Sequence, residues 1–307
     1  ALDRAKKRNA GAFFAAEAYD TDPAKLVDGN VLDALLASGF DAVYDDQTYD
    51  MLMAIYDGPK WANDLDSILQ GGRLHQSLRY AENHDEVRLA SPKTWGGLGM
   101  EVGRPVTGLL FGLGRGPTMI YSGQEVGEPA KGPEGFGGDD ARTTIFDYWS
   151  MPTLNQWTNG GKFDGGGLSN EQKDLRRWYG TLLKATAGPA FTKGEFYGLN
   201  HANQGNPDFG RLEGEGASGH WVYAFLRSEQ EKDGETVLVV VNLHPTQDFV
   251  NASVELPDDA LDWAKLDEGF GVKVLLAQEE PQRDGRQRVQ FCKLAKLSVQ
   301  MIGLSSK

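Results

Sequence analysis

The sequence has 307 residues, of which 40% are hydrophobic and 24% are charged, a composition typical of a globular protein with one large domain and a smaller one. Its 31 basic and 44 acidic residues give a net charge of −13, which argues against nucleic acid and anionic lipid as partners, because both attract basic surfaces. No apolar run reaches roughly 18 residues, so no membrane span is expected.

Cysteine and histidine give no sign of a metal centre. The single cysteine, Cys292, excludes an intrachain disulfide and a cysteine-rich metal site. It lies in a strand-like run, so we expect it to be a small buried hydrophobe. The five histidines have no metal-ligand spacing among themselves. The sequence therefore predicts no metal site and no cofactor in this chain.

The first part of the chain alternates short strand-like runs with helical runs. Strands are expected at residues 11–18, 40–44, 78–82 and 117–121. Helices are expected at residues 2–9, 24–38, 48–56, 62–69 and 102–113. No tight hairpin turn separates the strands, so we predict parallel strands joined by right-handed crossovers. About four such units make half of a closed eight-stranded barrel. An open doubly wound sheet is the alternative, but no glycine-rich phosphate loop follows the first strand.

The middle of the chain is rich in loops. Residues 127–138 contain many glycines and show no periodicity, and residues 160–167 form a second glycine-rich stretch. Long loops in compact domains commonly act as lids or binding loops. Ser169 and Gln172 have the spacing of a capping box, which predicts a helix that runs to about residue 186.

After Gly188-Pro189 the pattern changes to strands separated by turn residues. These strands are expected at 221–226, 237–241, 250–256, 272–276, 289–291 and 297–302. The pattern predicts an all-β sandwich. We therefore expect two domains, an α/β part over residues 1–187 and an all-β part over residues 188–307.

Two acids lie at or just after the ends of predicted strands of the α/β part. Glu17 lies at the end of the first predicted strand, and Asn83-His84-Asp85 follows the third. Parallel α/β barrels place their chemistry at the carboxyl ends of the strands, and a pair of acids is what glycoside hydrolysis requires. A neutral His can bond a hydroxyl, and an ionised Asp can stabilise positive charge on a sugar ring. The alternatives are that Glu17 begins a polar loop and that the triplet is a structural turn in which Asp85 caps a helix.

Several aromatic residues near these loops are candidates for stacking on sugars, although some must belong to the core. They are Trp95, Tyr121, Tyr148, Trp149 and Trp157.

Three motifs resemble the α-amylase family of glycoside hydrolases. The run 80–86, Tyr-Ala-Glu-Asn-His-Asp-Glu, resembles the Asn-His-Asp region of that family's seventh barrel strand. The runs 13–19 and 117–125 are similar to its fifth and eighth strands. The resemblance implies the second half of a (β/α)8 TIM-type barrel followed by an all-β sandwich domain. It also implies a retaining enzyme that hydrolyses α-1,4-glucosidic bonds.

The resemblance implies roles for individual residues. Glu17 corresponds to the proton donor and Asp85 to the transition-state stabiliser. His84 and Asn83 correspond to substrate-binding residues. We place with them Tyr19, two positions after Glu17, and Glu82, which directly precedes Asn83.

The family's N-terminal regions have no counterpart here. These regions carry the nucleophilic Asp, preceded two positions earlier by an Arg, a further Asn-His pair, and an inserted domain that often holds calcium. Half a barrel would expose an unpaired strand edge and an apolar inner face. We therefore expect the N-terminal half as a partner, as a separate or cleaved chain, and calcium only through that half. The expected substrate is an α-glucan or maltooligosaccharide.

Two other functions stay open. A glucanotransferase or maltosyltransferase of the same family would use the same catalytic groups with a sugar acceptor. A non-catalytic glucan-binding protein on a degenerate amylase fold would explain the missing nucleophile.

Overall fold

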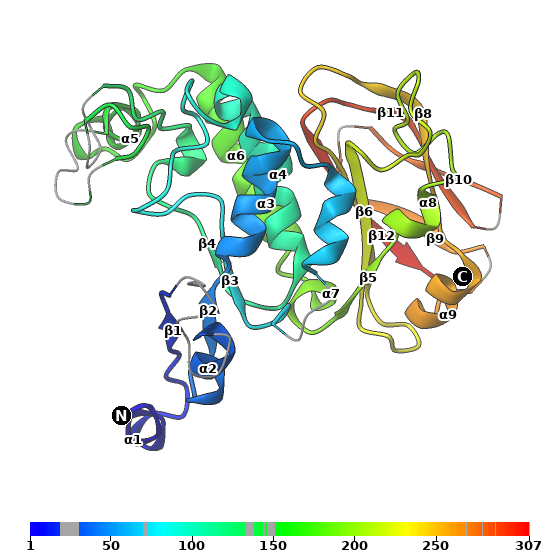
Figure 1. Ribbon diagram of the computed structural model, residues 1–307, viewed down its shortest axis with the longest axis horizontal. Coiled ribbons are helices and arrows are strands. Elements are labelled where there is room, and N and C mark those ends of the chain that lie inside the picture. The colour runs from blue at the N-terminus through cyan, green and yellow to red at the C-terminus, as the bar shows by residue number, and fades with distance from the viewer. Residues whose placement is uncertain are drawn as a thin grey trace.

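The structure is a computed structural model. It describes residues 1–18, 31–69, 73–132, 138–143, 145, 151–267, 269–277, 279–285 and 287–306. Figure 1 shows a parallel sheet and a group of helices at one side of the molecule and antiparallel sheets at the other, with the two termini at opposite ends. Within these ranges no helix combines the length and the apolar character needed to cross a bilayer.

Four short strands form a parallel sheet in the order in which they occur in the chain. They are β1 (Ala15–Ala16), β2 (Ala42–Tyr44), β3 (Ser77–Tyr80) and β4 (Thr118–Met119). Every neighbouring pair is parallel, as predicted. A doubly wound sheet reverses its strand order, whereas a barrel runs in sequence, so this order is that of a barrel segment. In the described residues the sheet stays open, with β1 and β4 each paired on one side only.

The helices around these strands begin and end for local reasons. Helix α1 (Leu2–Arg8) precedes β1, and those between the strands include α2 (Val31–Ala37), α3 (Asp46–Asp57), the 3₁₀ helix η2 (Ala62–Ser67) and α4 (Gly103–Leu113). Asp45 caps α3 by accepting a hydrogen bond from the Thr48 backbone N–H, and Gly58 ends the helix. The predicted helix start at residues 24–30 lies outside the described residues.

In its described residues, the connection after β4 includes short 3₁₀ helices and one α-helix before the long helix α6. These are η5 (Gln124–Val126), α5 (Pro152–Thr158), η7 (Asn159–Gly161) and α6 (Asn170–Ala185). The predicted capping box at the start of α6 is confirmed, because the side chains of Ser169 and Gln172 each accept the other's backbone N–H.

The remaining strands form two antiparallel sheets. The larger has the order β5-β6-β7-β12-β9, with β5 (Glu195–Gly198), β6 (Val222–Ser228), β7 (Thr236–Asn242), β12 (Ser298–Ser305) and β9 (Gly271–Leu276). The smaller has the order β10-β11-β8, with β10 (Gln282–Asp284), β11 (Arg288–Leu294) and β8 (Phe249–Glu255). An apolar cluster between them includes Leu238 and Val240 from one sheet and Val254 and Phe291 from the other.

Short elements escaped the sequence reasoning. They are β5, β10 and the helices α7 (Pro189–Thr192), α8 (Asn200–Asn203) and α9 (Asp258–Ala264). The expected burial of Cys292 is wrong, because it is exposed. Its neighbour Phe291 faces the core, and successive side chains of a strand point to opposite faces.

A second apolar cluster joins the α/β part to the larger antiparallel sheet. Helix α4 is buried along its length and packs on β7 and β12. At Gly108 a Cβ atom would lie 2.5 Å from Cγ1 of Val299, and at Gly112 it would lie 2.9 Å from the ring of Phe225. The predicted division near residue 187 stays a prediction, since this cluster includes residues from both sides of it.

Candidate active site

Glu17, His84 and Asp85 meet at one edge of the parallel sheet. Glu17 directly follows β1, and His84 and Asp85 follow β3. The Nε2 atom of His84 lies 3.3 Å from Oε1 of Glu17 and 3.3 Å from Oδ2 of Asp85. The three side chains are 39%, 31% and 46% exposed, so a ligand can reach them. The carboxyl ends of parallel strands share an edge, which is why residues so far apart in sequence come together here.

Asn83 shapes the turn that presents His84 and Asp85. Its Oδ1 accepts the backbone N–H groups of Asp85 and Glu86, each at 2.8 Å. Such a bond pattern fixes the chain direction after an Asn. The side chain is 1% exposed, and its Nδ2 has no hydrogen-bond partner among the described residues. For Asn83 the structure therefore shows the turn role, and a substrate contact stays a prediction.

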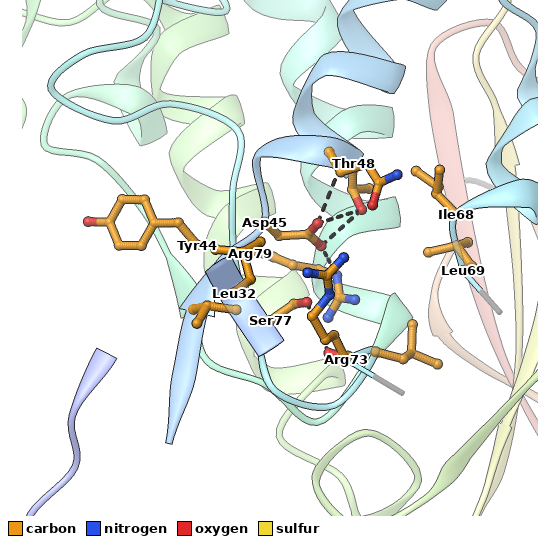
Figure 2. A pocket seen from close by; sticks show the side chains of 12 residues that line it. Leu32, Tyr44, Asp45, Thr48, Ile68, Leu69, Arg73, Ser77 and Arg79 are labelled. Carbon is orange, nitrogen blue, oxygen red and sulfur yellow. Dashed lines mark hydrogen bonds and ion pairs between the residues drawn. The ribbon is translucent and has the colours of Figure 1, made fainter. Parts of the chain in front are cut away.

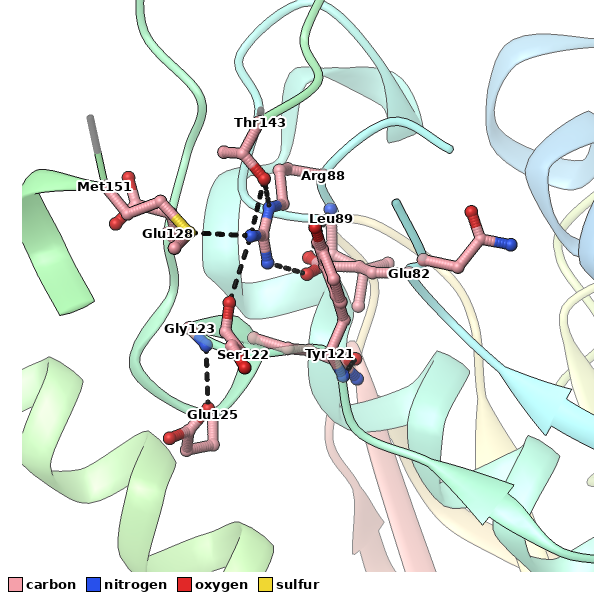
Figure 3. Close-up of polar contacts among 12 residues, drawn as sticks. Glu82, Arg88, Leu89, Tyr121, Ser122, Gly123, Glu125, Glu128, Thr143 and Met151 are labelled. Carbon is pink, nitrogen blue, oxygen red and sulfur yellow. Dashed lines mark hydrogen bonds and ion pairs between the residues drawn. The ribbon is translucent and has the colours of Figure 1, made fainter. Parts of the chain in front are cut away.

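Glu82 is a correction to the sequence reasoning. Its side chain is 1% exposed, and its Oε2 accepts Nη1 of Arg88 at 2.7 Å (Figure 3). Its Oε1 accepts the backbone N–H of Leu89 at 2.7 Å. A buried carboxylate that is paired in this way cannot touch a substrate. The predicted substrate-binding role of Glu82 is wrong, and its place is beneath the loop that carries His84 and Asp85.

Arg88 connects this loop to two others. Its guanidinium donates to Oγ1 of Thr143, with Nη2 at 2.7 Å and Nε at 3.0 Å, and Nη2 also donates to the Ser122 carbonyl at 3.0 Å. It lies over the ring of Tyr121, 4.3 Å from the centroid. Figure 3 shows these groups converging on the guanidinium. One face of Tyr121 is therefore already occupied.

Tyr44, at the end of β2, is a site neighbour that the sequence reasoning missed. Burial raises the pKa of its hydroxyl, and the negative charges of the Glu17 and Asp85 carboxylates raise it further. Strand β2 lies between β1 and β3 in the sheet, so its last residue reaches the same edge. The available signal was an aromatic residue at a strand end, directly before Asp45.

Asp45 belongs to a different environment from Tyr44. Figure 2 shows Tyr44 pointing away from Asp45, which faces a cavity of about 50 Å³ beneath the start of α3. Oδ2 of Asp45 lies 3.1 Å from Nε of the buried Arg79. Asp45 thus caps α3 and balances a buried guanidinium, which leaves Glu17 and Asp85 as the paired acids of the site.

Donor atoms of Glu17, His84 and Asp85 all lie within 4.8 Å of one another, close enough to hold one metal ion. Calcium takes oxygen ligands, so a set that includes an imidazole nitrogen does not suit it. The calcium site expected with the N-terminal half is therefore not formed by these three residues.

The other candidate residues divide between core, surface and segments outside the described residues. Trp95 is completely buried in the apolar cluster that joins the α/β part to the larger antiparallel sheet, so the prediction that it stacks on sugar is wrong. Trp157 is half-buried. Tyr19, Tyr148 and Trp149 lie outside the described residues.

No protein-family model and no curated protein sequence matches this chain. Solved structures do match. An Anoxybacillus α-amylase has a TM-score of 0.61 and 17% identity, with 100% of this chain and 55% of that chain covered. An α-amylase from H. orenii has a TM-score of 0.60 and 16% identity, with 99% and 55% covered. The cyclomaltodextrin glucanotransferase CldA has a TM-score of 0.56 and 15% identity, with 98% and 52% covered.

These comparisons show the fold. The chain shares its fold with α-amylase-family structures and spans about half of their length, consistent with a C-terminal half. The parallel sheet is thus derived from a TIM barrel, although in the described residues it does not close.

Proposed function

We propose that this chain is part of a retaining glycoside hydrolase that acts on α-1,4-glucosidic bonds of α-glucans or maltooligosaccharides. The observation that carries the proposal is the meeting of Glu17 and Asp85 on either side of His84, at the strand edge where barrels carry their chemistry. The Asn-His-Asp motif and the amylase-like fold support it.

Each residue has a definite role in the proposed reaction. Glu17 donates its proton to the leaving glycosidic oxygen, and its carboxylate then accepts a proton from the attacking water. The Asp85 carboxylate stabilises the positive charge that develops on the sugar ring. His84 is placed to hydrogen-bond a sugar hydroxyl beside both acids.

A retaining reaction needs a nucleophilic carboxylate in addition to the proton donor and the stabiliser. The donor oxygens of Glu17 and Asp85 lie within 4.8 Å of each other, so the proposed proton donor and stabiliser can act on the same sugar. The nucleophile itself would come from the N-terminal half of the barrel. That half would also pair with the open edges of β1 and β4.

Two alternatives have specific support. A glucanotransferase is favoured by the likeness to a cyclomaltodextrin glucanotransferase, and product analysis with an added sugar acceptor separates transfer from hydrolysis. A non-catalytic glucan-binding protein is favoured by the cluster itself, which among the described residues contains two carboxylates and no third for a nucleophile.

The proposal is tested by Glu17→Gln in the complete protein, with maltoheptaose as substrate. Because Gln cannot donate a proton to the leaving oxygen, kcat should fall by about two to four orders of magnitude. Glu101→Gln is the matched control, because its side chain is 58% exposed on the helix η4 (Gly99–Val102) and should leave kcat unchanged. A Glu17→Gln variant as active as wild type would refute the assignment of the acid.

A further inference from the structure

The loop after α5 displays one aromatic side chain in an unusual backbone conformation. Phe163 is 62% exposed and has φ of +54°. Gly160, Gly161 and Gly165 also have positive φ, so glycine is the residue that this loop uses for such conformations. Asn159 and Phe163 are the non-glycine residues of the loop with positive φ, and Asn tolerates this conformation far better than a bulky aromatic residue does. The position of Phe163 combines backbone strain with the exposure of a large apolar ring.

The rest of the loop is built to hold this conformation. The backbone N–H of Phe163 donates to the Thr158 carbonyl at 3.0 Å, and that of Gly165 donates to the Trp157 carbonyl at 3.0 Å. Oδ1 of Asp164 accepts Nδ2 of Asn159 at 2.8 Å. Strained residues persist when the surrounding structure fixes them, and they concentrate at functional positions. The ring is thus held outward by an ordered loop.

Phe163 belongs to a small aromatic surface. Its ring lies 5.6 Å from that of Trp157, with the planes at 58°. The guanidinium of Arg176, from α6, lies over Trp157 at 4.6 Å from the ring centroid. An aromatic surface with a guanidinium beside it has the chemistry that binds a sugar, which offers an apolar face and a rim of hydroxyls.

A series of side-chain contacts connects the element before this surface to the loop that carries His84 and Asp85. The first backbone N–H groups of α5, from Thr153 and Leu154, donate to Oε2 of Glu128 at 2.9 and 3.0 Å. Sδ of Met151 lies 3.4 Å from Nη2 of Arg88, which also pairs with Glu82 at the base of the His84–Asp85 loop. Helix α5 has seven residues and so spans about 10 Å. The aromatic surface is therefore joined through α5 to the structure that supports the His84–Asp85 loop.

We propose that Phe163 and Trp157 form a binding subsite for an α-glucan chain, remote from the bond that is cleaved. This proposal rests on the proposed function. Phe163 provides an exposed ring face for one glucose unit, and Trp157, backed by Arg176, supports it. The subsite acts on long substrates only, because a short sugar bound at Glu17 and Asp85 does not extend to it.

The test measures binding of maltoheptaose and of maltose by calorimetry, in the complete protein with Glu17→Gln to prevent turnover. Phe163→Ala should raise the Kd for maltoheptaose about three- to tenfold and leave the Kd for maltose unchanged. The matched control is Val250→Ala, which removes an exposed apolar side chain (70% exposed) from β8.

A second variant separates binding from folding. Phe163→Gly also removes the ring but relieves the positive φ, so the Kd for maltoheptaose should rise equally while Tm rises by about 1–2 °C. Unchanged maltoheptaose affinity in both variants would overturn the subsite and leave the proposed function standing. If the protein with Phe163 intact bound neither sugar, the proposed function would fall first, and the subsite with it.

Discussion

At the scale of single residues, the site depends on a buried ion pair that no ligand touches. Glu82 and Arg88 are 1% and 0% exposed, and together they close the loop that carries His84 and Asp85. Burial raises the pKa of the Glu82 carboxyl, and the positive charge of Arg88 opposes that rise. The role of the ion pair is therefore to hold the loop that carries His84 and Asp85 in place.

Removal of one partner should be far more damaging than removal of both. Arg88→Met leaves a buried carboxylate without its cation and should lower the free energy of unfolding by about 3–5 kcal/mol. Glu82→Gln with Arg88→Met should cost less than Arg88→Met alone, because no unpaired charge stays buried. Urea denaturation of both variants measures the difference. If the single variant and the double variant lost the same free energy of unfolding, Glu82 and Arg88 would not be energetically coupled.

The sequence was informative for some of these residues and silent for others. Glu17, His84 and Asp85 could be placed together because strand ends share an edge and because their motif resembles a known one. The position of Glu82 could not be inferred from its adjacency to the motif, since only the fold shows Arg88 turning back to meet it. Tyr44 was missed because no motif marks it.

At the scale of elements, helix α4 sets how the parallel sheet and the antiparallel sheet pack. A Cβ on Gly108 would lie 2.5 Å from Val299, closer than real contacts allow. Gly108→Ala should therefore lower the free energy of unfolding by about 1–3 kcal/mol through overpacking. The matched control is Gly180→Ala on α6, where no atom lies within 4 Å of the new Cβ and the helix should gain about 0.5–1 kcal/mol. If urea denaturation showed the same sign for both, close packing at Gly108 would be refuted.

His75, in the segment that precedes β3, contacts Glu195 of β5. This contact depends on the protonation state of the imidazole. Nε2 of His75 lies 2.8 Å from Oε2 of Glu195, and Nδ1 accepts the Arg115 backbone N–H at 3.2 Å. Burial lowers the pKa of His75, the charge of Arg115 lowers it further, and Glu195 opposes both. The folded protein thus favours the neutral form of the His75 imidazole.

The sign of the pH effect follows from that lowered pKa. Below about pH 6.5 the unfolded chain binds a proton at His75 that the folded chain resists. The stability associated with neutral His75 is present above that pH and is lost as the pH falls through the folded pKa. His75→Gln should therefore lose less stability than wild type between pH 7.5 and 5.5, as measured by urea unfolding. An identical loss in wild type and variant would contradict this account.

The elements that could be predicted were those long enough to show several repeats of a strand or helix pattern. The strands at 237–241 and 250–256 and the helix after Ser169 were placed from periodicity and capping. Elements of four residues, such as β5 and α8, contain only about one helical turn or two strand repeats, too few to establish a period. Strand β1 was expected over 11–18 but forms at Ala15–Ala16, where β2 is its neighbour among the described strands.

At the scale of the whole molecule, the open parallel sheet is the feature that the proposal must explain. The chain covers about half of the amylase-like structures it resembles, and its sheet ends at β1 and β4 without a further neighbour among the described strands. A retaining mechanism needs a nucleophile in addition to Glu17 and Asp85. Both facts are accounted for if a further set of barrel strands completes the sheet and supplies that group.

The measurement that tests this claim most directly is turnover of maltoheptaose combined with native mass spectrometry of the same preparation. We predict no turnover where the native mass equals the 33.6 kDa of this chain, and turnover where the mass is larger because the N-terminal strands are present. Turnover by the chain at 33.6 kDa would contradict the claim that the nucleophile lies outside it. Glucan binding without turnover in the larger species would instead identify a binding protein on an amylase fold.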